Sequence, residues 1–152
     1  MWHTILIALH AITGTVALLF GCVAHRRRVL FGTYLWSLVA TVVLLAAAVA
    51  EEWGRIDTAA RALFAAFVSL GLVMVLLAVG ARRLPAGSAG YIDRVGFTLV
   101  ALLDAFVVIM VLNLGAPVVL VVAAGVIVAV AGHFGLRAAK AGTAATEELV
   151  NP

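Results

Sequence analysis

Asp104 is the residue of this chain that most clearly suggests chemistry inside an apolar environment. It lies in an apolar run, and no other Asp, Glu, Lys or Arg occurs between Arg94 and Arg137. An ionisable side chain in the middle of a membrane helix costs about 3 kcal/mol on insertion scales, so a functional role is the default hypothesis. Asp104 is therefore a candidate for acid–base chemistry or proton transfer. A carboxyl that only fixes helix packing is the alternative.

Two further polar residues are expected at a depth similar to that of Asp104. His10 lies a few residues outward of the middle of the first apolar run, and Thr41 lies near the middle of the second, on a stripe with Thr33 and Ser37. At about 1.5 Å of rise per residue, Asp104, His10 and Thr41 can form one polar layer. A buried carboxyl and an imidazole can share a proton or move one. We take these three residues as catalytic or proton-handling candidates, with a structural hydrogen-bonded pair as the alternative.

His25 and His133 suggest a cofactor site. His25 follows the first apolar run and His133 lies near the end of the last, so both are expected at the same face of the membrane. The axial ligands of bis-histidine b-type haem meet the iron from opposite faces, which two histidines on different helices can do. Gly132 and Gly135 would leave room for a flat ring, and nearby arginines could pair with its propionates. Interfacial anchoring by two amphipathic imidazoles is the alternative.

Other residue types exclude several common functions. The single cysteine, Cys22, excludes an internal disulfide, a CxxC redox pair and a thiolate zinc site. No His-Glu-x-x-His motif, nucleophile elbow or phosphate-binding glycine loop occurs, and no metal site is predicted. No basic helix face with interleaved aromatic residues occurs, so nucleic acid is not an expected partner. Glu51, Glu52 and Asp57 form an acidic loop, which we expect to be solvated, with a cation or partner site as the alternative.

The elements that must position these residues are membrane helices. Hydrophobic residues make up 66% of the chain and charged residues 11%, whereas about a quarter of the residues in soluble domains are charged. Five apolar runs approach the roughly 20 residues that span a bilayer, at about 2–24, 29–50, 60–80, 95–112 and 116–136. Backbone polar groups in lipid must be satisfied within their own segment, so each run is expected to be a helix.

The predicted fold class is accordingly an all-α integral membrane protein, a bundle of five transmembrane helices. Residues 1–137 form a single transmembrane domain, and residues 138–152 form a frayed polar cytoplasmic tail. Gly115 is expected to end the fourth helix and Pro117 to begin the fifth, because glycine is favoured just after a helix and proline in its first turn.

The first helix carries a stripe of small and polar residues. His3, His10, Gly14, Ala17 and Gly21 recur at spacings of seven, four, three and four residues. Small residues allow membrane helices to approach closely, and polar side chains face the interior of a bundle. The stripe is therefore predicted to be the packing seam of this helix. The alternative is that both histidines are only hydrogen-bonded members of that seam.

The positions of lysine and arginine predict the orientation of the chain in the membrane. Of the ten such residues, Arg55 and Arg61 fall on one side of a five-helix topology. The other eight fall on the opposite side: Arg26, Arg27, Arg28, Arg82, Arg83, Arg94, Arg137 and Lys140. The positive-inside rule then places the amino terminus outside and the carboxyl terminus in the cytoplasm of a cell whose plasma (inner) membrane the chain spans. A signal peptide carries positive charge before its apolar run, so 1–24 is expected to be a retained helix.

The amino-terminal part of the chain resembles uncharacterised small bacterial multi-pass membrane proteins that have histidines in and just after their first helix. The resemblance covers about residues 5–45 and rests on His10, on His25-Arg26-Arg27 and on the opening of the second helix at Gly32, Thr33 and Tyr34. Some of these proteins are linked to the assembly of respiratory or haem-copper oxidases. The resemblance therefore implies a redox or cofactor role.

Three functional hypotheses follow. The first is a small redox-linked accessory or cofactor-binding protein, in which haem b is bound by the pair His25 and His133 or by His10. The second is a membrane-embedded enzyme that acts on a lipid or an isoprenoid, with Asp104 as the acid and His10 as its partner. The third is a proton-coupled transporter, which in a chain of this length would act as an oligomer. The expected partners are the lipid bilayer and either further copies of the chain or other membrane subunits.

Overall fold

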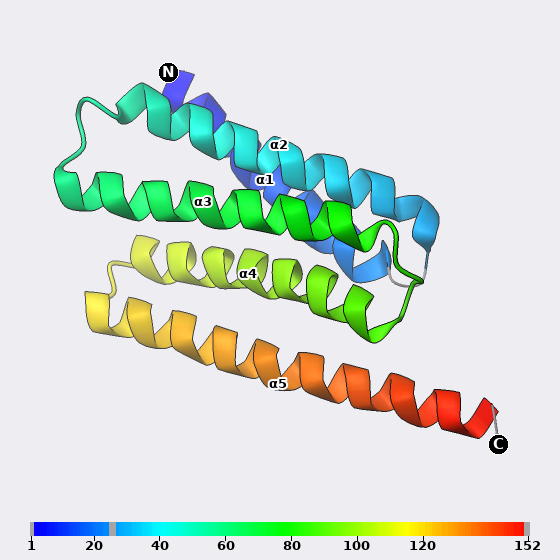
Figure 1. Ribbon diagram of the computed structural model, residues 1–152. Helices are drawn as coiled ribbons and strands as arrows, with labels where there is room; N and C mark the ends of the chain where they lie inside the picture. The colour runs from blue at the N-terminus through cyan, green and yellow to red at the C-terminus, as the bar shows by residue number, and fades with distance from the viewer. Residues whose placement is uncertain (1, 25–26, 151–152) are drawn as a thin grey trace. The chain divides into compact units, whose positions relative to one another are not determined.

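The structure is a computed structural model that describes the backbone of residues 2–24 and 27–150, and their side chains apart from 59, 112 and 144–150. Throughout this part of the chain the regular structure is helical, without a strand (Figure 1). Five of its helices are long and apolar enough to cross a membrane. The predicted all-α fold class of a multi-pass membrane protein is thereby confirmed, whereas the predicted orientation of the termini stays a prediction.

The helices follow the predicted apolar runs and extend past several of their ends. Their bounds are α1 Trp2–Ala24, α2 Phe31–Glu52, α3 Thr58–Ala81, α4 Ala89–Asn113 and α5 Val118–Val150, with a short 3-10 turn, η1, at Arg28–Leu30. The difference is largest for α4, which begins well before its predicted apolar run. Its first turns include the charged residues Asp93 and Arg94. Charged residues lower the hydropathy of a segment but are compatible with a helix, so a helix can begin before its apolar run does.

Side-chain caps set the first residues of α3 and α4. The backbone N–H of Ala60 donates to Asp57 Oδ1 at 2.7 Å, and that of Tyr91 donates to Ser88 Oγ at 3.3 Å. Each cap satisfies one of the N–H groups that a helix leaves unpaired in its first turn. Asp57, which was expected to belong to a solvated acidic loop, thus also caps a helix.

A tight turn joins α4 to α5, as the glycine and proline of this segment predict. Gly115 has a φ of 75°, in the left-handed region, and the N–H of Ala116 donates to the Val111 carbonyl at 3.4 Å. The carbonyl of Pro117 accepts from the N–H of Leu120 at 2.9 Å, which closes the first turn of α5. Glycine reaches positive φ without steric cost, so Gly115 allows the chain to reverse directly after α4.

The chain divides into two compact units, Met1–Val79 and Gly80–Pro152. In the first unit α1 packs against α2. Gly14, Ala17 and Gly21 of the predicted stripe are buried, together with Ala24, which confirms the small residues of the stripe as a packing seam. In the same unit, a Cβ added to Gly71 of α3 would lie 2.9 Å from Cγ2 of Val42 on α2, so these two helices also approach closely there.

In the second unit α4 packs against α5 along a row of residues spaced four apart on α4. Gly96 lies against Leu136, Val100 against Gly132, and Val108 together with Asp104 against Gly125. Residues four apart share one face of a helix. Glycines of both helices therefore lie in the interface, one on α4 and two on α5, and each accommodates a larger side chain of the other helix.

The fifth helix does not end near residue 136 but continues to Val150, so the prediction of a frayed tail from residue 138 differs from the structure. The segment is poor in large apolar residues, but alanine, lysine and glutamate have high helix propensity. In addition, Lys140 Nζ lies 2.6 Å from Asp93 Oδ1 and joins this extension to the start of α4. Hydropathy identifies where a helix can meet lipid, whereas propensity decides how far the helix continues.

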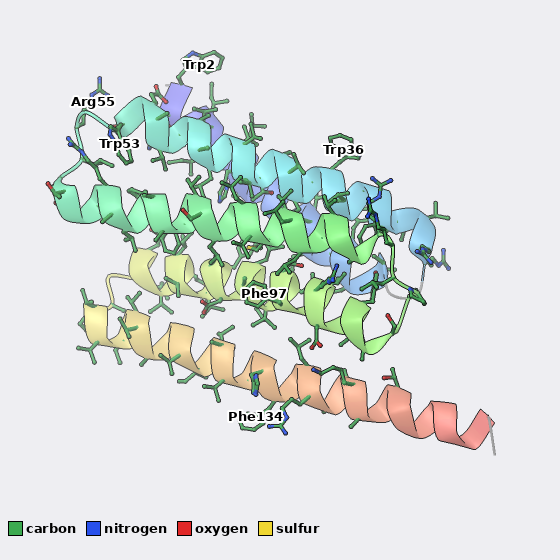
Figure 2. The ribbon with its side chains drawn as sticks, viewed as in Figure 1. Trp2, Trp36, Trp53, Arg55, Phe97 and Phe134 are labelled. Atoms are coloured by element: carbon green, nitrogen blue, oxygen red, sulfur yellow. The ribbon has the colours of Figure 1, made fainter. Side chains whose placement is uncertain are left out.

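Large apolar side chains cover the outside of these helices. Trp2 and Trp36 extend outward from α1 and α2 (Figure 2) and are 71% and 74% exposed. Trp53 follows the end of α2, where the Arg61 guanidinium carbon lies 6.0 Å from the centre of its ring. Exposed apolar side chains on long apolar helices indicate a lipid bilayer as the surroundings of the protein.

Candidate functional site

His10 is held by a hydrogen bond between α1 and α2. Its Nδ1 atom lies 2.9 Å from the main-chain carbonyl oxygen of Thr41. A carbonyl oxygen only accepts, so Nδ1 carries a proton and donates it to this bond. In the neutral ring, Nε2 is then the nitrogen with a free lone pair. The helix–helix contact therefore selects one tautomer of His10 and orients its ring.

Two threonine hydroxyls extend this polar contact. Thr41 Oγ1 lies 3.0 Å from Thr13 Oγ1 and 2.8 Å from the carbonyl oxygen of Ser37. Thr13 Oγ1 also lies 2.9 Å from the carbonyl oxygen of Leu9. Each hydroxyl has one proton, so it donates to one neighbour at a time and can accept from another. The hydroxyls are thereby satisfied within the two helices.

The expected common depth of His10 and Thr41 agrees with the structure, because the two residues are in contact. The contact uses the main-chain carbonyl of Thr41 rather than its hydroxyl. Thr13, which completes the cluster, was not among the predicted site residues. Its position three residues after His10, on the same face of one helix, is the sequence feature that would have identified it.

Asp104 lies in the second unit, on the face of α4 that packs against α5. Its Oδ1 atom is buried and has no hydrogen-bond partner within the described part of the chain. The nearest feature of α5 is Gly125, where an added Cβ would lie 3.4 Å from Oδ1 and 3.9 Å from Oδ2. His10 belongs to the first unit, so the proposed pairing of His10 with Asp104 stays a prediction.

His133 lies on α5 with its side chain exposed. Its ring is edge-on to that of Phe134, with centroids 5.7 Å apart and an interplanar angle of 74°. The space at Gly132 is occupied by Val100, so the interpretation that Gly132 leaves room for a flat ring is wrong; this glycine serves helix packing. Gly135 has open space beside it. His25 lies outside the described residues, so the pairing of His25 with His133 stays a prediction.

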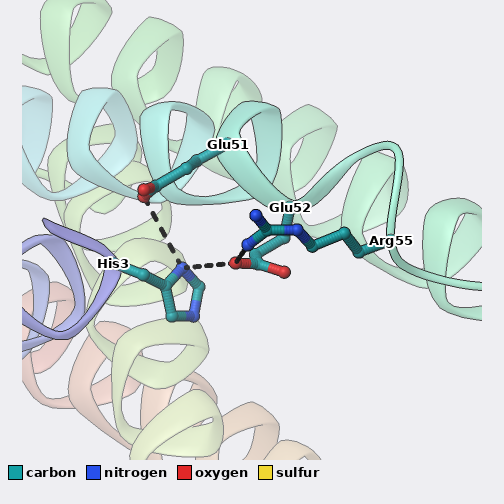
Figure 3. Close-up of polar contacts among 4 residues, drawn as sticks. All are labelled: His3, Glu51, Glu52 and Arg55. Atoms are coloured by element: carbon teal, nitrogen blue, oxygen red, sulfur yellow. Dashed lines mark hydrogen bonds and ion pairs between the residues drawn. The ribbon is translucent and has the colours of Figure 1, made fainter. Parts of the chain in front are cut away.

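A charged cluster joins the start of α1 to the end of α2 (Figure 3). His3 Nδ1 lies 3.9 Å from Glu51 Oε2 and 3.9 Å from Glu52 Oε1, too far for a hydrogen bond. Arg55 contacts the same Glu52 oxygen at 3.2 Å. The two acidic residues therefore face charged or ionisable neighbours, and the weak, partly exposed pairs contribute little to stability.

None of these clusters has the form of a metal centre. Among the described side chains, no group of three or more His, Cys, Asp or Glu residues is arranged to hold a metal ion. The cysteine, Cys22, is exposed and free. Comparisons with known protein families, with curated proteins and with solved structures find no match to this chain.

Proposed function

We propose that this chain is a small multi-pass membrane protein that binds a redox cofactor, b-type haem, with His10 as an axial ligand. The hydrogen bond from His10 Nδ1 to the Thr41 carbonyl, 2.9 Å long, is the observation that supports this proposal most directly. Histidines that bind metals usually donate their other ring N–H to a carbonyl or a carboxylate. Such a bond fixes the tautomer and the ring orientation and makes the coordinating nitrogen more basic.

The residues around His10 also keep its ring in a fixed orientation, which an axial ligand of haem inside a membrane requires. The carbonyl of Thr41 belongs to α2, so the ring is oriented by a rigid helix rather than by a loop. The hydroxyls of Thr13 and Thr41 bond to each other or to carbonyls of their own helices. The Nε2 lone pair of His10 is thus the group offered to a cofactor, and a bound haem would supply one-electron chemistry there.

Ligation by the pair His25 and His133 is the other form of the cofactor proposal, because both are expected at the cytoplasmic face, away from the depth of His10. His133 is exposed on α5, and Gly135 leaves open space near it. A haem held by His10 would be five-coordinate, since single-histidine ligation is common among haem proteins. The two forms differ in the spectrum they predict, because two strong nitrogen ligands favour a low-spin iron.

The test is the absorption spectrum of the protein, purified in mild detergent from haem-replete cells, before and after addition of dithionite. We expect a Soret band that shifts on reduction. In His10→Gly the band should be lost or strongly weakened, and imidazole added to this variant should restore it by entering the space of the missing ring. Restoration by imidazole separates the loss of a ligand from the loss of the fold.

His3→Ala is the matched control, because His3 lies on the same stripe of α1 seven residues earlier. It should keep the band. A colourless preparation of the unchanged protein would contradict haem binding altogether. A band that survives in His10→Gly but disappears in His133→Ala or His25→Ala would retain haem and reject His10 as its ligand.

A further inference from the structure

We propose that Asp104 is a reversible proton-binding site inside the membrane, at the interface of α4 and α5. The proposed cofactor function does not use this residue. Asp104 and Gly125 are in direct apposition across the interface, and Oδ1 of Asp104 is buried without a hydrogen-bond partner within the described residues. The site thus consists of the Asp104 carboxyl group, which lies against α5 and receives no hydrogen bond from the described residues of that helix.

The side chain of Asp104 lies on the face of α4 that packs against α5. Gly96, Val100, Asp104 and Val108 follow each other at four-residue spacing, and each contacts α5 or lies beside a glycine of α5. Asp104 therefore lies in the packed face of α4 rather than on the face toward lipid. An ionisable residue in such a face is presented to the interior of the protein, where a functional group is expected.

In the described parts of α4 and α5, no permanent countercharge lies close to Asp104. On α5 the nearest titratable residue is His133, eight positions beyond Gly125, which corresponds to about 12 Å along a helix axis. On α4 the nearest charged residues are Arg94 and Asp93, ten and eleven positions before Asp104, and Asp93 is bonded to Lys140 at 2.6 Å. Within this described helix pair, no fixed cation is close enough to neutralise the carboxylate.

A proton is the cation that fits this carboxyl group. A carboxylate with one buried oxygen and no partner is costly, whereas the neutral carboxyl leaves only a polar oxygen unsatisfied. A metal cation would need several further oxygen ligands, and backbone carbonyls at this depth are already bonded within their helices. A proton needs no further ligand. The carboxylate takes up one proton to form the neutral acid and releases it to form the carboxylate, so the step balances without another reactant.

The site can be tested with a membrane-permeant carbodiimide. The carboxyl proton passes to a carbodiimide nitrogen, a carboxylate oxygen bonds to the central carbon, and migration of the acyl group to nitrogen gives a stable acylurea that retains the whole reagent. Dicyclohexylcarbodiimide would be added to the full chain in liposomes, and the modified residue located by mass spectrometry of its peptides. We expect modification at Asp104, and none at this position in Asp104→Asn.

The pH dependence distinguishes a proton site from a carboxyl that is merely accessible. Above the titration midpoint the protonated fraction falls about tenfold for each pH unit, and the rate of modification should fall with it. A rate at Asp104 that does not change between pH 5 and pH 9 would overturn the proposal. Protection by sodium ions at constant pH would do so as well, because it would identify a metal-cation site.

Asp93→Asn is the matched control, since Asp93 lies on the same helix and is half exposed beside Lys140. It should leave the modification of Asp104 unchanged. Infrared spectroscopy of the unmodified protein gives a second readout that does not require reagent access. The carbonyl stretch of a protonated carboxyl should be present at low pH, lost at high pH and restored on return. Its absence at low pH, or its persistence at high pH, would contradict reversible proton binding.

Discussion

Nδ1 of His10 lies 2.9 Å from the carbonyl oxygen of Thr41, a residue 31 positions later in the chain. The bond joins α1 to α2 and determines which nitrogen of the imidazole keeps its lone pair. Nitrogen NMR of the protein free of cofactor, recorded at a pH where imidazole is neutral, should therefore show His10 protonated on Nδ1. A ring protonated on Nε2 would contradict both the hydrogen bond and the proposed role of Nε2 as a ligand.

The hydroxyls of Thr13 and Thr41 lie 3.0 Å apart and should stabilise the packing of α1 on α2 by a modest amount. Hydrogen bonds between membrane helices average about 0.6 kcal/mol. We expect Thr13→Val and Thr41→Val each to lower the free energy of unfolding slightly, and the double variant to lower it by less than their sum. Thermal unfolding in one detergent measures this coupling. Exact additivity would show that the two hydroxyls act independently.

Because Thr41→Val keeps the main-chain carbonyl that accepts from His10, the same variant also tests the proposed site. It should leave the Soret band of the haem-loaded protein in place. Loss of the band without loss of the fold would show that the Thr41 hydroxyl, rather than its carbonyl, supports His10.

Gly132 and Gly135 should respond differently to substitution by alanine. A Cβ at Gly132 would overlap the side chain of Val100, whereas nothing lies within 4 Å of a Cβ at Gly135. Overpacking typically costs about 1–3 kcal/mol, so Gly132→Ala should lower the unfolding temperature and Gly135→Ala should not. Addition of Val100→Ala should restore stability to Gly132→Ala. Equal effects of the two glycine substitutions would contradict the packing of α5 on α4.

The ion pair between Lys140 and Asp93, at 2.6 Å, should hold the last part of α5 in place. Partly exposed pairs contribute roughly 0–1 kcal/mol, so overall stability should change little on Lys140→Ala. Hydrogen exchange of residues 138–143 should nevertheless become faster. Exchange as fast as in an unfolded peptide already in the unchanged protein would show that this segment is not helical.

The predicted orientation can be tested with single cysteines in a Cys22→Ala background. Gly54→Cys lies in the connection after α2, and Ala86→Cys in that between α3 and α4. If the amino terminus is outside, a membrane-impermeant maleimide added to intact cells should modify Gly54→Cys only. After permeabilisation it should modify both. Modification of Ala86→Cys alone in intact cells would reverse the predicted topology.

The sequence by itself determined the class of this protein and the approximate position of its helices. Long apolar runs with few charges are stable in lipid as helices, because a helix satisfies its own backbone hydrogen bonds. The residue types next to one another in the chain are sufficient to predict a turn such as the one at Gly115. The stripe of Gly14, Ala17 and Gly21 likewise identified a buried face, because the spacing of residues on a helix depends only on the regular geometry of the backbone.

Only the tertiary structure showed which residues of a neighbouring helix contact each helix face. The sequence shows Gly132 beside His133 but could not show that Val100 fills the space next to Gly132. Nor could it show that Asp104 lies against Gly125, or that His10 bonds to the backbone of Thr41. Such contacts join residues far apart in the chain. They depend on the register and rotation of two helices, which packing of the whole interface selects and no local pattern encodes.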